Sequence, residues 1–318
     1  MITTLRKQGT KTGLRDPAGA VYPEQMRLIP AILLAAITLS AQPLARLQSN
    51  IERITRSVNA DWGIYIKCLE TGEEISLNAD HQMDTMSVIK IPLMVEAFQQ
   101  IEEGKFALTD RITLKESDKR PGTGVIRSLD PGDVLTIKDL LTLMIIVSDN
   151  TATDLMFDRV GGIEPVNRLM DSYGLKSIRA VAPGSAWFAA LRAAPSAEVF
   201  HREGKTAYGL ASPRDIGRLL EKMERGEAVS KKASEQMLAI LRGQVYSSRL
   251  PKYVTGFRIP HKTGDFLPYI GNDVGVLESD KLHIVISVFT AHHYGVGTYL
   301  EDAIGRIAEL TANYFSSR

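Results

Sequence analysis

The 318-residue chain contains a single cysteine, Cys68, so an internal disulfide is excluded. Because Cys68 lies in the apolar stretch WGIYIKCL, we expect a small buried side chain rather than a reactive thiol. The six histidines are scattered apart from the adjacent His292 and His293, and no two share a helix face as metal ligands would. We therefore expect neither a metal nor another cofactor. The net charge of +1 gives no electrostatic reason to expect a nucleic-acid partner.

The sequence also lacks an apolar run long enough to span a bilayer. The stretch MRLIPAILLAAITLSAQ at residues 26–42 has one basic residue, an apolar core and small residues after it, which is the form of a secretory signal. The residues before it are polar and patternless, so we expect translation to start at Met26. On this interpretation residues 1–41 are the extension and signal peptide, and residues 42–318 form the functional domain. An uncleaved N-terminal anchor is the alternative, and either one places the domain outside the cytoplasm, secreted or periplasmic.

Apolar patterning predicts strands near both ends of the domain and helices between them. Residues 62–78 predict a hairpin around the turn ETGEE, and residues 258–264, 272–279 and 282–291 are strand-like. Residues 174–211 show no period and predict a long irregular loop. Helical spacing predicts helices at 43–58, 87–103, 136–147, 151–159, 163–173, from Pro213 onward, 230–242 and 298–315.

This order of elements predicts an α+β fold, in which an antiparallel sheet is flanked by helices and interrupted by an inserted all-helical lobe. The stretch TIKDLLTLMIIV at residues 136–147 is apolar nearly all round, so its helix is expected to be buried. Because no exposed apolar helix requires a partner, we expect a monomer.

The stretch DTMSVIKIPLM places a serine and a lysine, Ser87 and Lys90, three residues apart at the start of a predicted helix. Residues at this spacing share a helix face. A lysine that is partly desolvated has a lowered pKa and can remove the proton of a serine nucleophile. Ser-x-x-Lys occurs by chance roughly once in a chain of this length, usually on a solvated helix turn. The apolar neighbours favour the catalytic interpretation here.

Two further polar motifs follow in order along the chain. Ser148-Asp149-Asn150 comes directly after the apolar helix, where it would serve as a helix cap, or as a proton-relaying hydroxyl beside an amide that binds substrate. His261-Lys262-Thr263-Gly264 ends a predicted strand. Lys-Thr-Gly alone is a common strand end, but Lys262 and Thr263 would suit a substrate carboxylate, and Gly264 would let a substrate backbone approach.

The three motifs S-x-x-K, S-D-N and K-T-G in this order resemble those of class A β-lactamases and penicillin-binding proteins. The resemblance extends to PGTGVIRSL, to YGLASPRDIGRLLEKM and to the order of elements, over roughly residues 45 to 316. It implies a β-lactamase/transpeptidase-like fold and a serine hydrolase that needs no metal. The implied substrate is a small-molecule β-lactam or a cell-wall peptide.

The resemblance also implies a role for each motif residue. Ser87 would be acylated as the β-lactam ring opens, Lys90 would assist removal of its proton, and Ser148 would pass a proton to the leaving nitrogen. The backbone N–H groups of Ser87 and Asp265 would form the oxyanion hole. Substrate binding would fall to Asn150 for the acyl side chain and to Lys262, Thr263 and Gly264 around the carboxylate.

The pattern breaks in the loop after the second motif. The class A family uses a glutamate there, with an asparagine four residues on, to hold the water that hydrolyses the acyl-enzyme. No Asn or Gln occurs between Arg168 and Glu235. Glu198 lies near the expected distance before Pro213 and is the candidate base, unless it is an ordinary solvated glutamate; His201 is a further candidate. Without such a base the chain would behave as a D-Ala-D-Ala peptidase that β-lactams trap, or as a binding domain without turnover.

Overall fold

The computed structural model describes the backbone of residues 28–203 and 207–318, and the side chains of residues 43–200 and 207–318. Residues 46–318 form one compact unit, to which helix α1 (Leu28–Ser57) belongs from Arg46 onward. The predicted start at Met26 lies outside the described residues, and the predicted signal core has a helical backbone from Leu28 onward. None of the helices in the described ranges has both the length and the apolar character required to cross a bilayer.

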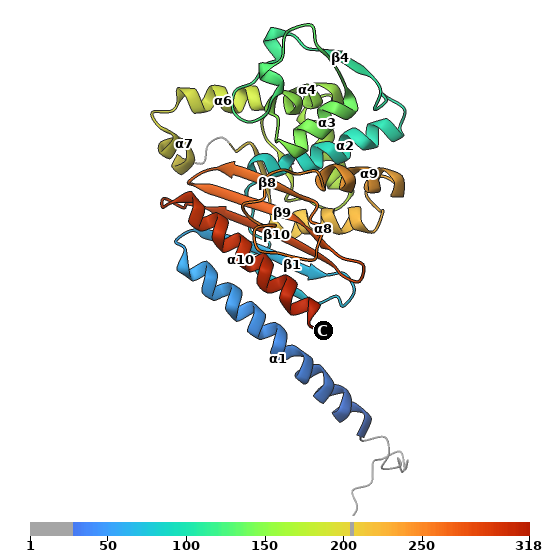
Figure 1. Cartoon of the computed structure of the whole chain (residues 1–318), viewed down its shortest axis with the longest axis vertical. Coiled ribbons are helices and arrows are strands. Elements are labelled where there is room, and N and C mark those ends of the chain that lie inside the picture. Colours follow the sequence, from blue (N-terminus) through green and yellow to red (C-terminus); the bar gives the residue numbers. More distant parts are fainter. Residues whose placement is uncertain (1–27, 204–206) are drawn as a thin grey trace, which may run out of the picture. The chain divides into compact units, whose positions relative to one another are not determined.

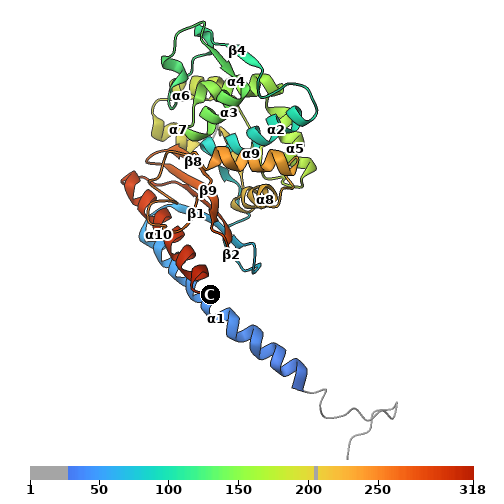
Figure 2. The ribbon, with the colours of Figure 1, turned by 45° about the vertical axis from the view of Figure 1, so that its right-hand side comes forward.

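A five-stranded antiparallel sheet with the order β2-β1-β10-β9-β8 forms the base of the unit (Figure 1). The N-terminal hairpin and the C-terminal meander meet at its centre, where Ile64 of β1 pairs with Val288 of β10. Helix α10 (Gly297–Ser316) covers one face and α8 (Pro213–Glu224) the other (Figure 2). Cys68 is buried on β1 as expected. The strands are β1 (Asp61–Cys68), β2 (Glu74–Leu77), β8 (His261–Phe266), β9 (Ile270–Glu278) and β10 (His283–Ala291).

The helical lobe lies beyond the β8 edge of this sheet, and the predicted α+β fold is confirmed (Figure 1). The apolar helix α3 (Ile137–Ile146) is buried as predicted, through the side chains of Ile137, Leu140, Leu141, Met144 and Ile145. The helix predicted at Ser87–Glu103 begins instead with a 3-10 turn, η2 (Met86–Ile89), and the α-helix α2 follows from Lys90. The lobe contains α2 (Lys90–Glu102), α3 (Ile137–Ile146), α4 (Asn150–Val160), α5 (Ile163–Ser172), α6 (Gly184–Ala193) and α9 (Lys231–Leu241), with short turns η3 (Glu116–Asp118) and η4 (Ile126–Ser128) and the hairpin β4 (Arg111–Thr113) and β5 (Val134–Thr136).

The prediction of an irregular loop over residues 174–211 was wrong. This segment contains two helices, α6 and α7 (Ala197–Glu203), and two short strands, β6 (Arg179–Ala180) and β7 (Gly209–Ala211). Both strands pair antiparallel in a small sheet of order β3-β7-β6, which also includes β3 (Met83–Asp84) just before Ser87. Strand pairing therefore joins this segment to β3, which lies just before the predicted nucleophile Ser87.

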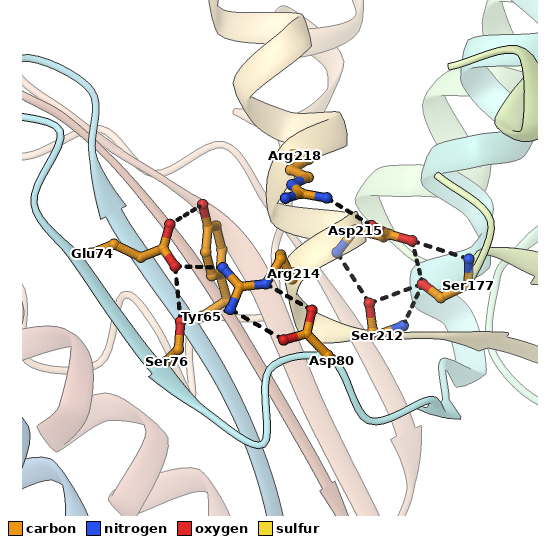
Figure 3. A network of polar contacts seen from close by, with 9 residues as sticks. All are labelled: Tyr65, Glu74, Ser76, Asp80, Ser177, Ser212, Arg214, Asp215 and Arg218. Carbon is orange, nitrogen blue, oxygen red and sulfur yellow. Dashed lines mark hydrogen bonds and ion pairs between the residues drawn. The ribbon is translucent and has the colours of Figure 1, made fainter. Parts of the chain in front are cut away.

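A polar network holds the two ends of this segment together (Figure 3). The Ser177 hydroxyl donates to Asp215 at 2.6 Å, and the Ser177 backbone N–H donates to the same carboxylate at 3.0 Å. The Ser212 backbone N–H donates to Ser177 Oγ, also at 3.0 Å. Ser212 Oγ also accepts the Asp215 N–H at 3.2 Å, so the predicted serine cap of α8 is confirmed. Beside it, Arg214 donates to Asp80 at 2.7 Å and anchors the network to the β2–β3 connection.

Candidate active site

Ser87 lies in the 3-10 turn that leads into α2, and its side chain is partly exposed. Among the described residues, no hydrogen bond is formed by its hydroxyl. The preceding residue, Met86, has φ = 45°, a left-handed conformation that is uncommon for a residue other than glycine. Strand β8 packs directly on this turn at Gly264, where a Cβ would collide with the carbonyl oxygen of Thr85. Gly264 therefore has a packing role that its predicted role in substrate approach did not include.

Lys90 is completely buried one turn after Ser87. Its ammonium donates three hydrogen bonds, to the carbonyl and hydroxyl oxygens of Ser148 at 2.8 and 2.9 Å and to Asn150 Oδ1 at 3.0 Å. Burial lowers the Lys90 pKa well below its ordinary value, and the nearby charge of Lys262 lowers it further. The structure thus brings the first two predicted motifs into direct contact through a buried amine whose surroundings favour its neutral form.

Ser148-Asp149-Asn150 forms the turn between α3 and α4, with Ser148 at φ = 54°. Asp149 caps α4 by accepting the Ala152 N–H at 2.9 Å, so the capping interpretation of this motif is confirmed. The other carboxylate oxygen of Asp149 accepts the N–H groups of Val125 and Ile126 at 2.6 and 2.9 Å. Capping and chemistry are compatible here, because Asp149 performs the first while its neighbours face Lys90.

The loop before the turn is held to the same motif. The Asn150 side-chain amide donates to the Pro121 carbonyl at 2.9 Å, and the Thr123 hydroxyl donates to the Ser148 carbonyl at 2.7 Å. At Gly124, the second glycine of PGTG, a Cβ would overlap Asp149, so the close approach of the loop requires a glycine there. The resemblance in PGTGVIRSL therefore has a physical basis, since this loop forms a wall beside the second motif.

Strand β8 contributes Lys262 and Thr263, both buried. The Lys262 ammonium donates to the Thr263 carbonyl at 2.9 Å. The Lys262 pKa is lowered to about 8, mainly by burial; the charges of Asp265 and Asp273 oppose this fall, and the charge of Arg249 adds to it. The exposed Asp265 pairs its side chain with the buried Arg249, and its backbone pairs with Gly271 on β9. A cation, a hydroxyl and the Asp265 backbone therefore lie together at the edge strand beside η2.

The two candidate bases lie on α7. Glu198 is exposed in the first turn of this helix, where Ser196 Oγ accepts the Val199 N–H at 3.1 Å. His201 also falls within α7, but its side chain lies outside the described residues. The geometry thus draws Ser87, Lys90, Ser148, Asn150, Lys262 and Thr263 into one region and places Glu198 on a separate, surface helix.

Sequence reasoning missed Asp154, a buried residue one helical turn after Asn150. Its carboxylate accepts Arg120 Nε at 2.6 Å and the backbone N–H groups of Gly184 and Ser185 at 2.7 and 2.9 Å. These bonds fix the start of α6 against α4. The spacing from Asn150 was visible in the sequence, because residues four apart share a helix face.

No group of three or more histidine, cysteine, aspartate or glutamate side chains in the described part of the chain is arranged to bind a metal ion. The site itself brings together a partly exposed serine, two buried lysines, hydroxyl groups, an amide and backbone N–H groups.

Known proteins resemble this chain in both sequence and structure. The chain is 24% identical to beta-lactamase VEB-1 of Pseudomonas aeruginosa over 92% of its length and all of that protein. Its structure resembles the beta-lactamase from Sphaerobacter thermophilus, with 30% identity, a TM-score of 0.73, and coverage of 87% of this chain and 97% of that one. It also resembles PBP-A, with 25% identity, a TM-score of 0.74, and coverage of 86% and 97%. A model of the beta-lactamase enzyme family matches residues 45–315, and the chain belongs to that family.

Proposed function

We propose that the protein opens the β-lactam ring by forming an acyl-enzyme on Ser87. The observation that carries this proposal is the fully buried Lys90 ammonium, hydrogen bonded to Ser148 Oγ at 2.9 Å and lying one turn from Ser87. Burial lowers the Lys90 pKa and so favours the neutral amine, the form that can accept a proton. Few structural roles require a desolvated cation at this place, since burying it is costly.

In the proposed reaction, Ser87 Oγ bonds to the lactam carbonyl carbon and the ring C–N bond breaks. The Ser87 proton passes to Lys90, the Ser148 hydroxyl gives its proton to the leaving nitrogen, and Lys90 returns a proton to Ser148 Oγ across their 2.9 Å contact. The N–H groups of Ser87 and Asp265 stabilise the developing oxyanion. Lys262 and Thr263 hold the substrate carboxylate, and Asn150 binds the acyl side chain. Water then cleaves the ester, with Glu198 as the proposed base.

Intact mass spectrometry after brief exposure to benzylpenicillin tests the first step. We expect a mass increase equal to one β-lactam on wild type and none on Ser87→Ala. The time course of the adduct and turnover of a chromogenic cephalosporin report deacylation separately. An equal adduct on Ser87→Ala would refute the mechanism, and a permanent adduct on wild type would refute hydrolytic turnover.

A second function is a peptidase that acts on cell-wall stem peptides and hydrolyses its β-lactam adduct slowly. It is favoured by the absence of an Asn or Gln from residues 168–235 and by the exposure of Glu198. Among the similar structures, a PBP-A mutant at 26% identity is described as an acyl-enzyme complex with penicillin G. Release of D-alanine from a D-Ala-D-Ala peptide with a long-lived penicillin adduct would support this function, whereas rapid loss of the adduct would exclude it. If no β-lactam labels Ser87, the protein would be a binding domain.

We also propose that the enzyme acts outside the cytoplasm, because residues 26–41 have the form of a secretory signal. A reporter enzyme that is active only after export, fused after residue 42, should be active when preceded by residues 26–42 and inactive when Leu33 and Leu34 are replaced by arginine. Analytical ultracentrifugation of residues 42–318 tests the proposed monomer, for which a single species near the monomer mass is expected.

A further inference from the structure

The residue just before the proposed nucleophile adopts a backbone conformation that its side chain disfavours. Met86 has φ = 45°, where the Cβ of an L-residue crowds the backbone. The peptide unit between Met86 and Ser87 carries the Ser87 N–H, one of the two proposed oxyanion donors. Because a peptide unit is planar, the dihedral angles of Met86 set the direction of that N–H. A contact that holds Met86 in place therefore also orients Ser87.

Asp84 makes that contact. Its Oδ1 accepts the backbone N–H of Met86 at 2.8 Å, the bond that aspartate side chains form with the residue two positions on in tight turns. Asp84 is itself fixed from two sides. It pairs with Leu210 between β3 and β7, and its carbonyl oxygen accepts Asn272 Nδ2 at 2.8 Å from β9. The carboxylate is thus presented to Met86 from a rigid position.

The remaining contacts of the segment do not replace this bond. Thr85 is tied by its N–H to the Gly209 carbonyl at 2.9 Å, and its hydroxyl donates to the Met86 carbonyl at 3.1 Å. The first fixes Thr85, and the second holds the carbonyl end of the peptide unit that carries the Ser87 N–H. Neither satisfies the Met86 N–H, which Asp84 accepts. Without that acceptor, the Met86 N–H loses its partner and the disfavoured φ of Met86 is held less firmly, so the Ser87 N–H can shift even though Thr85 still bonds the Met86 carbonyl.

The surroundings of Asp84 are apolar on one side. Asp84 and Met86 line a cavity of about 200 Å³ whose wall includes the rings of Trp187, Phe200 and Phe266. A hydrogen bond to a carboxylate is stronger where water is scarce. Burial also raises the pKa of Asp84 to about 7, while the bond from Met86 opposes the rise. Asp61, His81 and His292 line the same cavity.

We propose that Asp84 is a positioning residue for the nucleophile: its carboxyl group holds the Met86 N–H and thereby keeps the Ser87 hydroxyl and N–H in the orientation that acylation requires. This inference rests on the proposed acylation of Ser87. Asp84 touches neither the substrate nor the reacting atoms, so its effect should appear in the rate of acylation rather than in substrate binding.

The test measures the acylation rate constant and the substrate dissociation constant separately, by rapid-quench mass spectrometry over a range of benzylpenicillin concentrations. Asp84→Ala should lower the rate constant about tenfold to a hundredfold, the range for a lost hydrogen bond to a charged group, with the dissociation constant within about twofold of wild type. Asp84→Asn keeps an oxygen acceptor in the same place and should retain the rate within about threefold.

A double-mutant cycle with Met86→Gly identifies the cause. Glycine adopts positive φ without penalty, so removing the Asp84 acceptor should cost much less in the Met86→Gly protein than in wild type. Asp61→Asn is the matched control, because Asp61 lines the same cavity but bonds His292, at 2.7 Å, instead of Met86. It should acylate at the wild-type rate.

The inference is overturned if folded Asp84→Ala acylates like wild type, if Asp84→Asn loses as much as Asp84→Ala, or if the two losses simply add in the cycle. A fall in thermal stability without a fall in acylation also overturns it. If Asp84→Ala does not fold, Asp84→Asn decides: a fall of more than about threefold in its acylation rate constant, with the fold intact, also overturns the inference. Absence of an adduct on wild type, by contrast, is a failure of the proposed function itself.

Discussion

The depressed pKa of Lys262 predicts an alkaline limit to the reaction with substrates that carry a carboxylate. Only the ammonium form of Lys262 attracts that carboxylate, and burial lowers the pKa of the free site to about 8. The charge is therefore present below pH 8 and lost as the pH rises through that value. Lys90 acts in the opposite sense, because its neutral form is the base. Burial and the nearby charge of Lys262 lower the Lys90 pKa and so favour this neutral form.

The size of the effect follows from the titration of a single group. Each pH unit above 8 removes about nine-tenths of the remaining Lys262 charge, so kcat/KM for benzylpenicillin should fall about tenfold per unit, or about 1.4 kcal/mol. Because kcat/KM reports the ionisation of the free enzyme, the substrate's own effect on the Lys262 pKa does not enter. Acylation rates at low substrate concentration between pH 6 and pH 10, followed by intact mass, supply the profile.

The methyl ester of benzylpenicillin is the matched control, since it presents the same ring without the carboxylate charge. Its kcat/KM should be low throughout and should lack the alkaline fall above pH 8. A profile for benzylpenicillin that stays flat to pH 10, or an equal fall for the ester, would show that Lys262 does not bind the carboxylate through its charge.

Three further outcomes are expected. Ser148→Ala should slow acylation about 10²–10⁴-fold with the fold intact, because Lys90 keeps two of its three acceptors; burst kinetics checks this, and a loss under threefold contradicts the relay. Gly264→Ala should destabilise the protein by about 1–3 kcal/mol and slow acylation, since its Cβ meets the Thr85 carbonyl; an unchanged denaturation midpoint and rate would refute the packing argument. Asp215→Ala should lower the Tm by about 2–10 °C, because the Ser177 hydroxyl and N–H lose their acceptor. Asp80→Ala, which removes an exposed partner of Arg214, is the control. An equal fall in Tm for the two variants would contradict the argument that the buried Asp215 bonds stabilise the fold.

The sequence predicted the site better than the segment around it, for a physical reason. Ser87 and Lys90 are one helical turn apart, and Ser148 follows an apolar helix that has to be buried, so local rules place both motifs. The Ser212 cap and the hairpin at residues 62–78 were predictable in the same way. Each of these features depends on residues close together in the chain.

The missed features depend on distant contacts or short elements. Helix α7 has seven residues, too few to establish a period, and strands β6 and β7 have two and three. Asp154 resembles any acidic residue on a solvated helix face until Gly184 and Ser185, thirty residues away, are seen to donate to it. Gly264 likewise acquires its packing role from Thr85 on a remote segment.

The two halves of the proposed reaction are carried by different parts of the protein. Lys90 and Ser148 are buried beside the partly exposed Ser87, and Lys262 lies on a paired strand of the main sheet. The candidate base Glu198 instead occupies an exposed seven-residue helix between the anchored ends of its segment. Phe200 packs this helix against the rings of Trp187 and Phe266, while Glu198 lies on its exposed first turn. Substitutions in α7 should therefore change the lifetime of an acyl-enzyme while leaving its rate of formation to the buried lysine and serine groups.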